Sequence, residues 1–190
     1  MEILLLGTAT AILLWWLSQQ IGRISFTELY PIVMKYSNTY KVDPALVFAI
    51  IEQESAFRPK AYRIEEAYWR KYILPNPKYK TNPFLKDKTA WGSWGLMQIL
   101  YDTALQYDMP PNIHPSKWLT IPENNIKIGV KYLADLFQRY KELSDVIAHY
   151  NGGSYAVRHK ILTGRYSNQK YVDSVLKRYA KWSKIFMKRS

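Results

Sequence analysis

The sequence predicts an all-α domain, and three observations support this prediction. Apolar residues recur at helical spacing in several long segments of the chain. Helix start and stop signals bound these segments, such as Asp43 with Pro44 at one start and Pro110 with Pro111 at one end. No convincing hairpin signal separates them, so the segments are expected to pack as helices around one core.

Two helices are predicted near the start of the domain. Residues 23–41 predict the first, because four of its residues fall on one face: Leu29, Ile32, Val33 and Tyr36. Residues 44–55 predict the second, with Asp43 as its N-cap and Pro44 at its first helical position.

The middle of the chain is rich in Pro, Lys and Tyr, and it predicts shorter elements. Residues 58–91 are expected to form a short helix over 63–73 followed by loop. Residues 95–108 predict a helix that the two following prolines end. The segment HPSKWL at 114–119 predicts a loop.

The C-terminal part predicts three further helices and a short one. Thr120 is expected to cap a helix over 122–141, whose stripe is Ile126, Val130, Leu133, Phe137 and Tyr140. Ser144 is expected to cap the next helix, which ends at Gly152 and Gly153. A short helix over 154–163 precedes the last, 168–186, whose apolar face is Val172, Val175, Leu176, Tyr179 and Trp182.

An uncharged N-terminal segment divides the chain into residues 1–22 and a domain over 23–190. Ile3–Gly22 contains no charged residue over 20 positions, and a helix of that length reaches roughly 30 Å, enough to cross a bilayer. Trp15 and Trp16 fall where an interfacial aromatic belt is expected. A cleavable signal peptide is the alternative, but no A-x-A pattern follows the apolar stretch. The sequence therefore favours an uncleaved membrane anchor or signal-anchor segment.

Composition limits the partners and the chemistry. The net charge of +12 favours anionic partners or serves solubility alone, and no nucleic-acid-binding motif is present. The chain has no cysteine, which excludes disulfides, thiolate nucleophiles and Cys-ligated zinc. Its histidines, His114, His149 and His159, are isolated rather than at metal-ligand spacing. We therefore expect no metal and no cofactor.

The strongest candidate for catalysis is Glu54. It follows Val47, Ile50 and Ile51 at helical spacing, so it continues their buried face, whereas Glu52 is expected to point toward solvent. A carboxyl group on an apolar face loses hydration and its pKa rises. An acid that stays protonated near neutral pH suits general-acid cleavage of a glycosidic bond. The alternative is a buried glutamate paired with Arg or Lys.

Three later stretches carry further candidates. WGSWGLMQI at 91–99 contains Gly95, where the backbone can approach a ligand closely, followed by Met97 and Gln98. AHYNGG at 148–153 ends in Tyr150 and Asn151 before two glycines, and QKYVDSVL at 169–176 contains Tyr171. Each aromatic residue and Met97 could equally belong to the core.

Together, QES-F-P-A at 53–61, GLMQI at 95–99, YNGG at 150–153 and YV at 171–172 resemble lytic transglycosylases of the soluble-transglycosylase (SLT) type. The resemblance covers about residues 42–182 and implies a goose-lysozyme-like helical fold. It implies that Glu54 is the single acid and base. It also implies a substrate-binding cleft whose residues are Ser55, Gly95, Met97, Gln98, Tyr150, Asn151 and Tyr171.

The chain departs from the family pattern in three places. Gly95 follows Glu54 by 41 positions (95 − 54), a longer gap than is usual in the family, so residues 62–91 read as an insert. His149 replaces a small residue of the usual AYNAG, and Ser167 stands where a glutamate is often found before the YV pair. The insert brings Glu65 and Glu66, which are candidates for a second carboxylate.

The resemblance implies cleavage of the β-1,4 bond between N-acetylmuramic acid and N-acetylglucosamine in peptidoglycan, with closure of a 1,6-anhydro ring. A hydrolytic muramidase is an alternative, because Glu65 or Glu66 could activate water. A non-catalytic wall-binding or virion structural protein is another. The enzyme would be membrane-anchored and would act in the periplasm or cell envelope. It could belong to a phage virion, be another phage-encoded protein, or serve a secretion-associated assembly.

Overall fold

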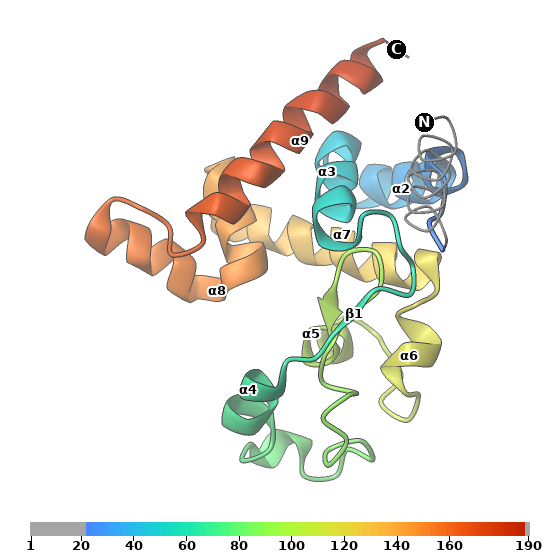
Figure 1. Cartoon of the computed structure of the whole chain (residues 1–190), viewed down its shortest axis with the longest axis vertical. Coiled ribbons are helices and arrows are strands. Elements are labelled where there is room, and N and C mark those ends of the chain that lie inside the picture. Colours follow the sequence, from blue (N-terminus) through green and yellow to red (C-terminus); the bar gives the residue numbers. More distant parts are fainter. Residues whose placement is uncertain (1–21, 189–190) are drawn as a thin grey trace, which may run out of the picture.

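The structure is a computed structural model that describes residues 22–188. Its longer helices gather in the upper half of Figure 1: α2 (Phe26–Tyr40), α3 (Pro44–Ser55), α7 (Pro122–Arg139), α8 (Leu143–Thr163) and α9 (Gln169–Met187). Helix α3 packs against α9, and α2 packs against α7. The prediction of a mostly helical domain is confirmed.

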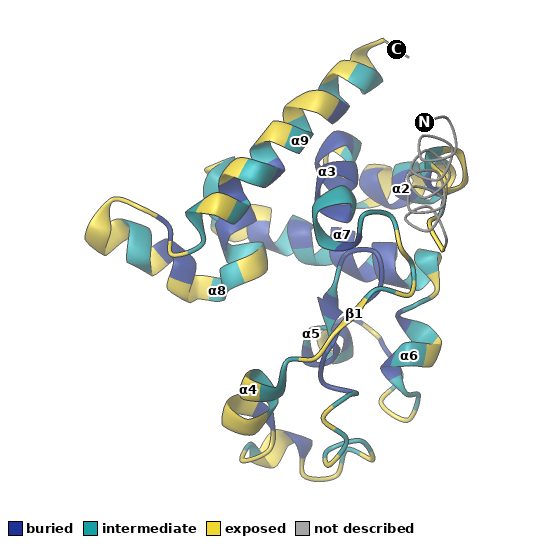
Figure 2. Cartoon of the chain, in the orientation of Figure 1, coloured by how far each residue is buried: buried dark blue, intermediate teal, exposed yellow. Residues whose placement is uncertain are grey.

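Helix α3 is the centre of the core, as Figure 2 shows by its dark colour. Every residue from Ala45 to Ile51 is buried, so this helix is enclosed on all sides rather than on one stripe. Its start follows the predicted signals, because the Asp43 side chain accepts a hydrogen bond from the Ala45 N–H and Pro44 takes the first position. Helix α2 begins with a capping box between Ser25 and Glu28.

Aromatic rings hold α9 against α3. The rings of Phe48 and Trp182 stack with their centroids 4.9 Å apart, and Phe26 stacks on Trp182 at 5.5 Å. Glu52 joins this contact, since its carboxylate accepts hydrogen bonds from Lys181 at 2.5 Å and from the Trp182 indole at 2.7 Å. The prediction that Glu52 points to solvent is therefore wrong, because its side chain contacts α9.

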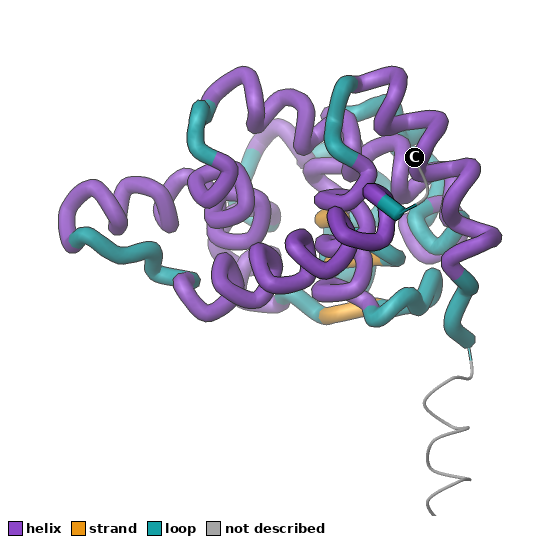
Figure 3. The backbone as a smooth tube through the Cα atoms, turned by 90° about the horizontal axis from the view of Figure 1, so that it is seen from above, coloured by secondary structure: helices purple, strands orange, loops and turns teal. Residues whose placement is uncertain are grey.

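A small antiparallel sheet lies below the helices, and it was not predicted. Its order is β1 (Tyr62–Arg63), β2 (Ser93–Trp94) and β3 (Ile99–Leu100), drawn in orange in Figure 3. Tyr62 pairs with Trp94, and Trp94 pairs with Ile99. Strands of two residues are too short to show the alternating pattern from which strands are predicted.

Short helices complete the lower half of Figure 1 around this sheet: α4 (Glu66–Tyr68), the π-helix η1 (Trp69–Ile73), the 3-10 helix η2 (Pro77–Tyr79), α5 (Tyr101–Gln106) and α6 (Pro115–Trp118). Part of the predicted helix 63–73 is thus present. The predicted helix 95–108 starts only at Tyr101, because Gly95 and Gln98 have positive φ. The predicted loop 114–119 contains α6, which the His114 side chain caps by accepting a hydrogen bond from the Ser116 N–H.

Two predicted caps differ from the structure, whereas one predicted helix end is confirmed. Thr120 does not cap α7, since its hydroxyl donates to the Ser116 carbonyl, and Ile121 is the N-cap. Glu142, not Ser144, precedes α8. The predicted helix end at Gly152 and Gly153 is confirmed, because Gly153 has non-helical dihedral angles (φ 61°, ψ −168°) and the kink there separates the two helical parts of α8.

The predicted membrane anchor cannot be followed in this structure, because residues 1–21 lie outside the described part of the chain. Within residues 22–188, no helix has the length and apolar character needed to cross a membrane.

Candidate active site

Glu54 lies in the last turn of α3 and is half-buried. Its Oε1 accepts a 2.6 Å hydrogen bond from the phenol of Tyr171 at the start of α9. Burial raises the pKa of Glu54 above its ordinary value, and it outweighs the hydrogen bond from Tyr171 and the charge of Arg63, which lower it. The salt bridges found within residues 22–188 do not include Glu54, so the alternative of a buried ion pair is not observed.

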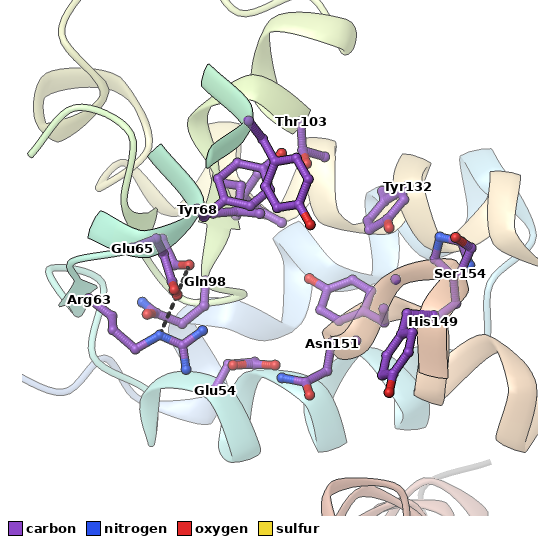
Figure 4. A pocket seen from close by; sticks show the side chains of 18 of the residues that line it. Glu54, Arg63, Glu65, Tyr68, Gln98, Thr103, Tyr132, His149, Asn151 and Ser154 are labelled. Carbon is purple, nitrogen blue, oxygen red and sulfur yellow. Dashed lines mark hydrogen bonds and ion pairs between the residues drawn. The ribbon is translucent and has the colours of Figure 1, made fainter. Parts of the chain in front are cut away.

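Two hollows meet at Glu54. The larger, about 630 Å³, is the aromatic hollow, because five tyrosines line it: Tyr68, Tyr72, Tyr132, Tyr150 and Tyr155. The second is about 570 Å³. Glu54, Arg63 and Gln98 line both. Figure 4 shows the Glu54 carboxylate between Arg63 and Asn151, with Gln98 across from it. A group bound in either hollow therefore reaches the same carboxyl.

The loop that carries Gln98 is fixed by a buried amide. Asn125 on α7 is 0% exposed. Its Nδ2 donates to the carbonyls of Trp94 at 2.8 Å and Leu119 at 2.9 Å, and its Oδ1 accepts from the Met97 N–H at 2.8 Å. Tyr150 donates to the Met97 carbonyl at 2.8 Å. These four bonds satisfy the buried backbone of the loop and set the position of Gln98.

Some of the predicted site residues line the aromatic hollow and others support it. Glu54, Glu65, Gln98, Tyr150 and Asn151 line it. Asn151 Oδ1 accepts a hydrogen bond from Asn168 at 3.0 Å, so its amide nitrogen is the group left to donate to a ligand.

Three predicted substrate contacts, Ser55, Gly95 and Met97, are buried and line neither hollow. Ser55 donates to the Ile51 carbonyl at 3.0 Å within α3, and the Met97 sulfur packs against Gly129 of α7. These residues shape the site from beneath. Tyr171 also lines neither hollow and reaches the site through its bond to Glu54.

The two candidate second carboxylates differ. Glu66 lines neither hollow and pairs with Arg70 at 2.6 Å and Lys88 at 2.9 Å. Glu65 lines the aromatic hollow, where its Oε1 accepts from Arg63 at 2.6 Å and from Ser93 at 3.1 Å. Of the two, Glu65 alone shares a hollow with Glu54.

The phenols of the site are neutral hydrogen-bond donors at physiological pH. Burial raises the pKa of Tyr150 and Tyr171 well above the ordinary tyrosine value, and the Glu54 charge raises both further. Burial likewise raises the pKa of Tyr132 to about 12. They can therefore stabilise a carboxylate or a sugar oxygen without adding charge.

Several residues of the site were not singled out from the sequence. Tyr68, from the predicted insert, donates a hydrogen bond to the buried Asp102 carboxylate and so ties α4 to α5. Tyr132 lines the aromatic hollow from α7. His149, interpreted as unimportant, also lines it and shares a 2.9 Å hydrogen bond with Tyr140. Within residues 22–188, no group of three or more His, Asp or Glu side chains is placed to hold a metal ion.

The sequence is similar to those of a known protein family. Residues 31–172 match the family described as the transglycosylase SLT domain. A relative, the membrane-bound lytic murein transglycosylase C of Serratia proteamaculans (strain 568), is 29% identical over an alignment of 136 positions that covers 67% of this chain and 32% of the relative.

The fold is also similar to a solved structure. The crystal structure of the 70 kDa soluble lytic transglycosylase SLT70 from Escherichia coli matches with a TM-score of 0.59 and 24% identity. The match covers 92% of this chain and 26% of that chain. The chain thus corresponds to only part of each of these larger proteins.

Proposed function

The chain belongs to the transglycosylase SLT domain family, and from this membership we propose that it is a peptidoglycan lytic transglycosylase. It would cleave the β-1,4 bond between N-acetylmuramic acid and N-acetylglucosamine and leave a 1,6-anhydro end. The observation that carries the proposal is Glu54, a half-buried carboxyl group with a raised pKa at the junction of two hollows. A carboxyl group that holds its proton is what a general acid for glycoside cleavage requires.

In the proposed mechanism Glu54 acts twice. As an acid it donates its proton to the oxygen of the leaving N-acetylglucosamine while the glycosidic bond breaks. As a carboxylate it then takes the proton of the muramic C6 hydroxyl, whose oxygen attacks C1 and closes the anhydro ring. The attacking hydroxyl belongs to the same sugar, so its effective concentration is high and no second carboxylate is needed to activate water. Tyr171 stabilises the carboxylate between the two steps through its 2.6 Å bond.

The aromatic hollow suits a chain of amino sugars. Its five tyrosines offer flat apolar faces to pyranose rings. The Gln98 amide oxygen can accept a hydrogen bond and the Asn151 amide nitrogen can donate one, which matches the N–H and the carbonyl of the substrate's N-acetyl groups. We therefore place the glycan strand along this hollow, with the bond to be cleaved beside Glu54.

The mass of the released muropeptides tests the proposal. Digestion of purified sacculi is expected to release muropeptides with anhydro ends, which lack the added water of hydrolysis products. Glu65→Gln is expected to change the rate, because it breaks the 2.6 Å pair with Arg63, but not the product mass. Products that carry added water, and that disappear in Glu65→Gln, would instead establish a hydrolase that uses Glu65 to activate water.

Removal of one hydroxyl tests the partner of Glu54. Tyr171→Phe deletes the bond that favours ionised Glu54, so the pKa of Glu54 is expected to rise further. The alkaline limb of the kcat/KM profile should move to higher pH. Tyr166→Phe is the matched control, because it removes a similar bond, to Asp145 at 2.5 Å, from a residue that lines neither hollow. An unchanged alkaline limb in Tyr171→Phe would show that another group sets it.

We also propose that residues 1–22 anchor the enzyme in a membrane so that the domain acts within the cell envelope. The support is the 20-residue uncharged stretch Ile3–Gly22. The full chain is expected to sediment with membranes and to stay there in high salt and at alkaline pH, whereas a chain that lacks residues 2–21 is expected in the supernatant. A full chain released by salt alone would indicate electrostatic attachment through its net charge of +12 instead.

A further inference from the structure

The second hollow at Glu54 is basic, and the proposed mechanism leaves it without a role. We call it the basic hollow. Besides Glu54, Arg63 and Gln98, the residues that line it are Gly22, Arg58, Lys60, Ala61 and Tyr62. Arg63 is neutralised by Glu65 at 2.6 Å. By contrast, the ion pairs of the described residues give no carboxylate partner to Arg58 or Lys60. Two cations that have no carboxylate partner among the described residues, beside the proposed catalytic carboxyl, indicate a site for an anionic group.

The backbone holds Arg58 in a fixed position. It follows two consecutive non-glycine residues with positive φ, Ala56 (49°) and Phe57 (65°). This unfavourable turn is held in place because the Phe57 ring packs on Trp182 at 5.9 Å and its carbonyl accepts the Ile24 N–H at 2.9 Å. Arg58 Nε donates to the Ser55 carbonyl at 3.1 Å. The terminal guanidinium nitrogens then remain to bind an anion.

We propose that the basic hollow binds a carboxylate of the stem peptide on the muramic acid whose bond Glu54 cleaves. This inference rests on the proposed function. Muramic acid differs from N-acetylglucosamine by a lactyl ether that carries a peptide with free carboxylates. That substituent lies on the reacting sugar, so its site must adjoin Glu54, as the basic hollow does. The aromatic hollow receives the sugar rings, and Arg58 and Lys60 together bind a carboxylate of the peptide.

The experiment compares two substrates on the full chain: glycan strands that bear stem peptides, and the same strands stripped of peptide by an amidase. Wild type is expected to cleave the peptide-bearing strands with the higher kcat/KM. The double variant Arg58→Gln with Lys60→Gln should lower that preference about tenfold, since each bond to a charged group contributes strongly. Lys60→Gln alone, which removes an exposed side chain, should lower it part of the way.

A matched control removes the same charge elsewhere. Lys177→Gln with Lys184→Gln takes two cations from exposed positions of α9 that line neither hollow, and it should keep the wild-type preference. Added salt should weaken the preference in wild type more than in the Arg58/Lys60 variant. The proposal is overturned if wild type cleaves both substrates equally, or if the double variant loses activity equally on both. Failure of wild type on both substrates would instead overturn the proposed function.

Discussion

Glu54→Gln is expected to reduce the rate of glycan cleavage by about 10²-fold to 10⁴-fold, the usual contribution of a general acid. Glutamine keeps an oxygen that can accept the Tyr171 hydrogen bond of 2.6 Å, so the site keeps its shape but loses its proton. The measurement is release of anhydro-muropeptides from sacculi under single-turnover conditions.

The matched control is Glu52→Gln, two residues away on the same helix. Glu52 accepts hydrogen bonds from Lys181 and Trp182 and lines neither hollow, so its loss should weaken the contact between α3 and α9 and leave cleavage intact. If Glu54→Gln released anhydro-muropeptides as fast as wild type, Glu54 would not be the catalytic acid; if neither protein released any, the chain would be a wall-binding protein rather than an enzyme.

The same substitution should stabilise the fold at neutral pH. The folded state raises the pKa of Glu54, so it holds the proton more tightly than the unfolded chain, whose carboxyl has the ordinary value of 4.5. The free energy of unfolding therefore falls as the pH rises from that value through the folded pKa. Glutamine does not ionise, so Glu54→Gln should raise Tm more at neutral pH than at about pH 4. At the lower pH the Glu54 carboxyl is mostly protonated in the folded state and in the unfolded state alike. An equal change at both pH values would mean that Glu54 ionises normally.

The acid was predictable from the sequence because one helix determines it. Val47, Ile50 and Ile51 are all 0% exposed, and a carboxylate at the next position of that face must lie at the edge of the core. Helical spacing alone was therefore enough to choose Glu54 rather than Glu52 as the candidate acid. It did not show that Glu52 would be drawn to α9, because that contact joins residues 129 and 130 positions apart.

The opposite wall of the site was not predictable for the same reason. Asn125 has no local signal in the sequence, since its three hydrogen bonds go to backbone groups of Trp94, Met97 and Leu119. Tyr68 likewise acquires its role only through Asp102, 34 positions away. Both pairings depend on tertiary contacts, to which patterns of periodicity and capping are blind.

Gly95→Ala is expected to destabilise the fold strongly. Gly95 has φ +77°, and a Cβ built on it would lie 2.2 Å from the Leu119 carbonyl oxygen and 2.3 Å from Asn125 Nδ2. Backbone cannot yield as a side chain does, so the loop must move and the Asn125 bonds must break. We expect a loss of about 4 kcal/mol in the free energy of unfolding, from left-handed strain, overpacking and unsatisfied polar groups together.

Gly164→Ala separates these contributions. Gly164 has the same φ of +77°, but a Cβ there meets nothing within 4 Å. It should cost only the backbone strain, about 1 kcal/mol, and denaturant unfolding of the two variants measures the difference. Because the displaced loop carries Gln98 to the junction of the two hollows, Gly95→Ala should also lose cleavage activity at temperatures where it stays folded, while Gly164→Ala keeps it. Equal losses of stability in the two variants would show that Gly95 is needed only for its backbone conformation, and that its close approach to α7 does not hold the active-site loop.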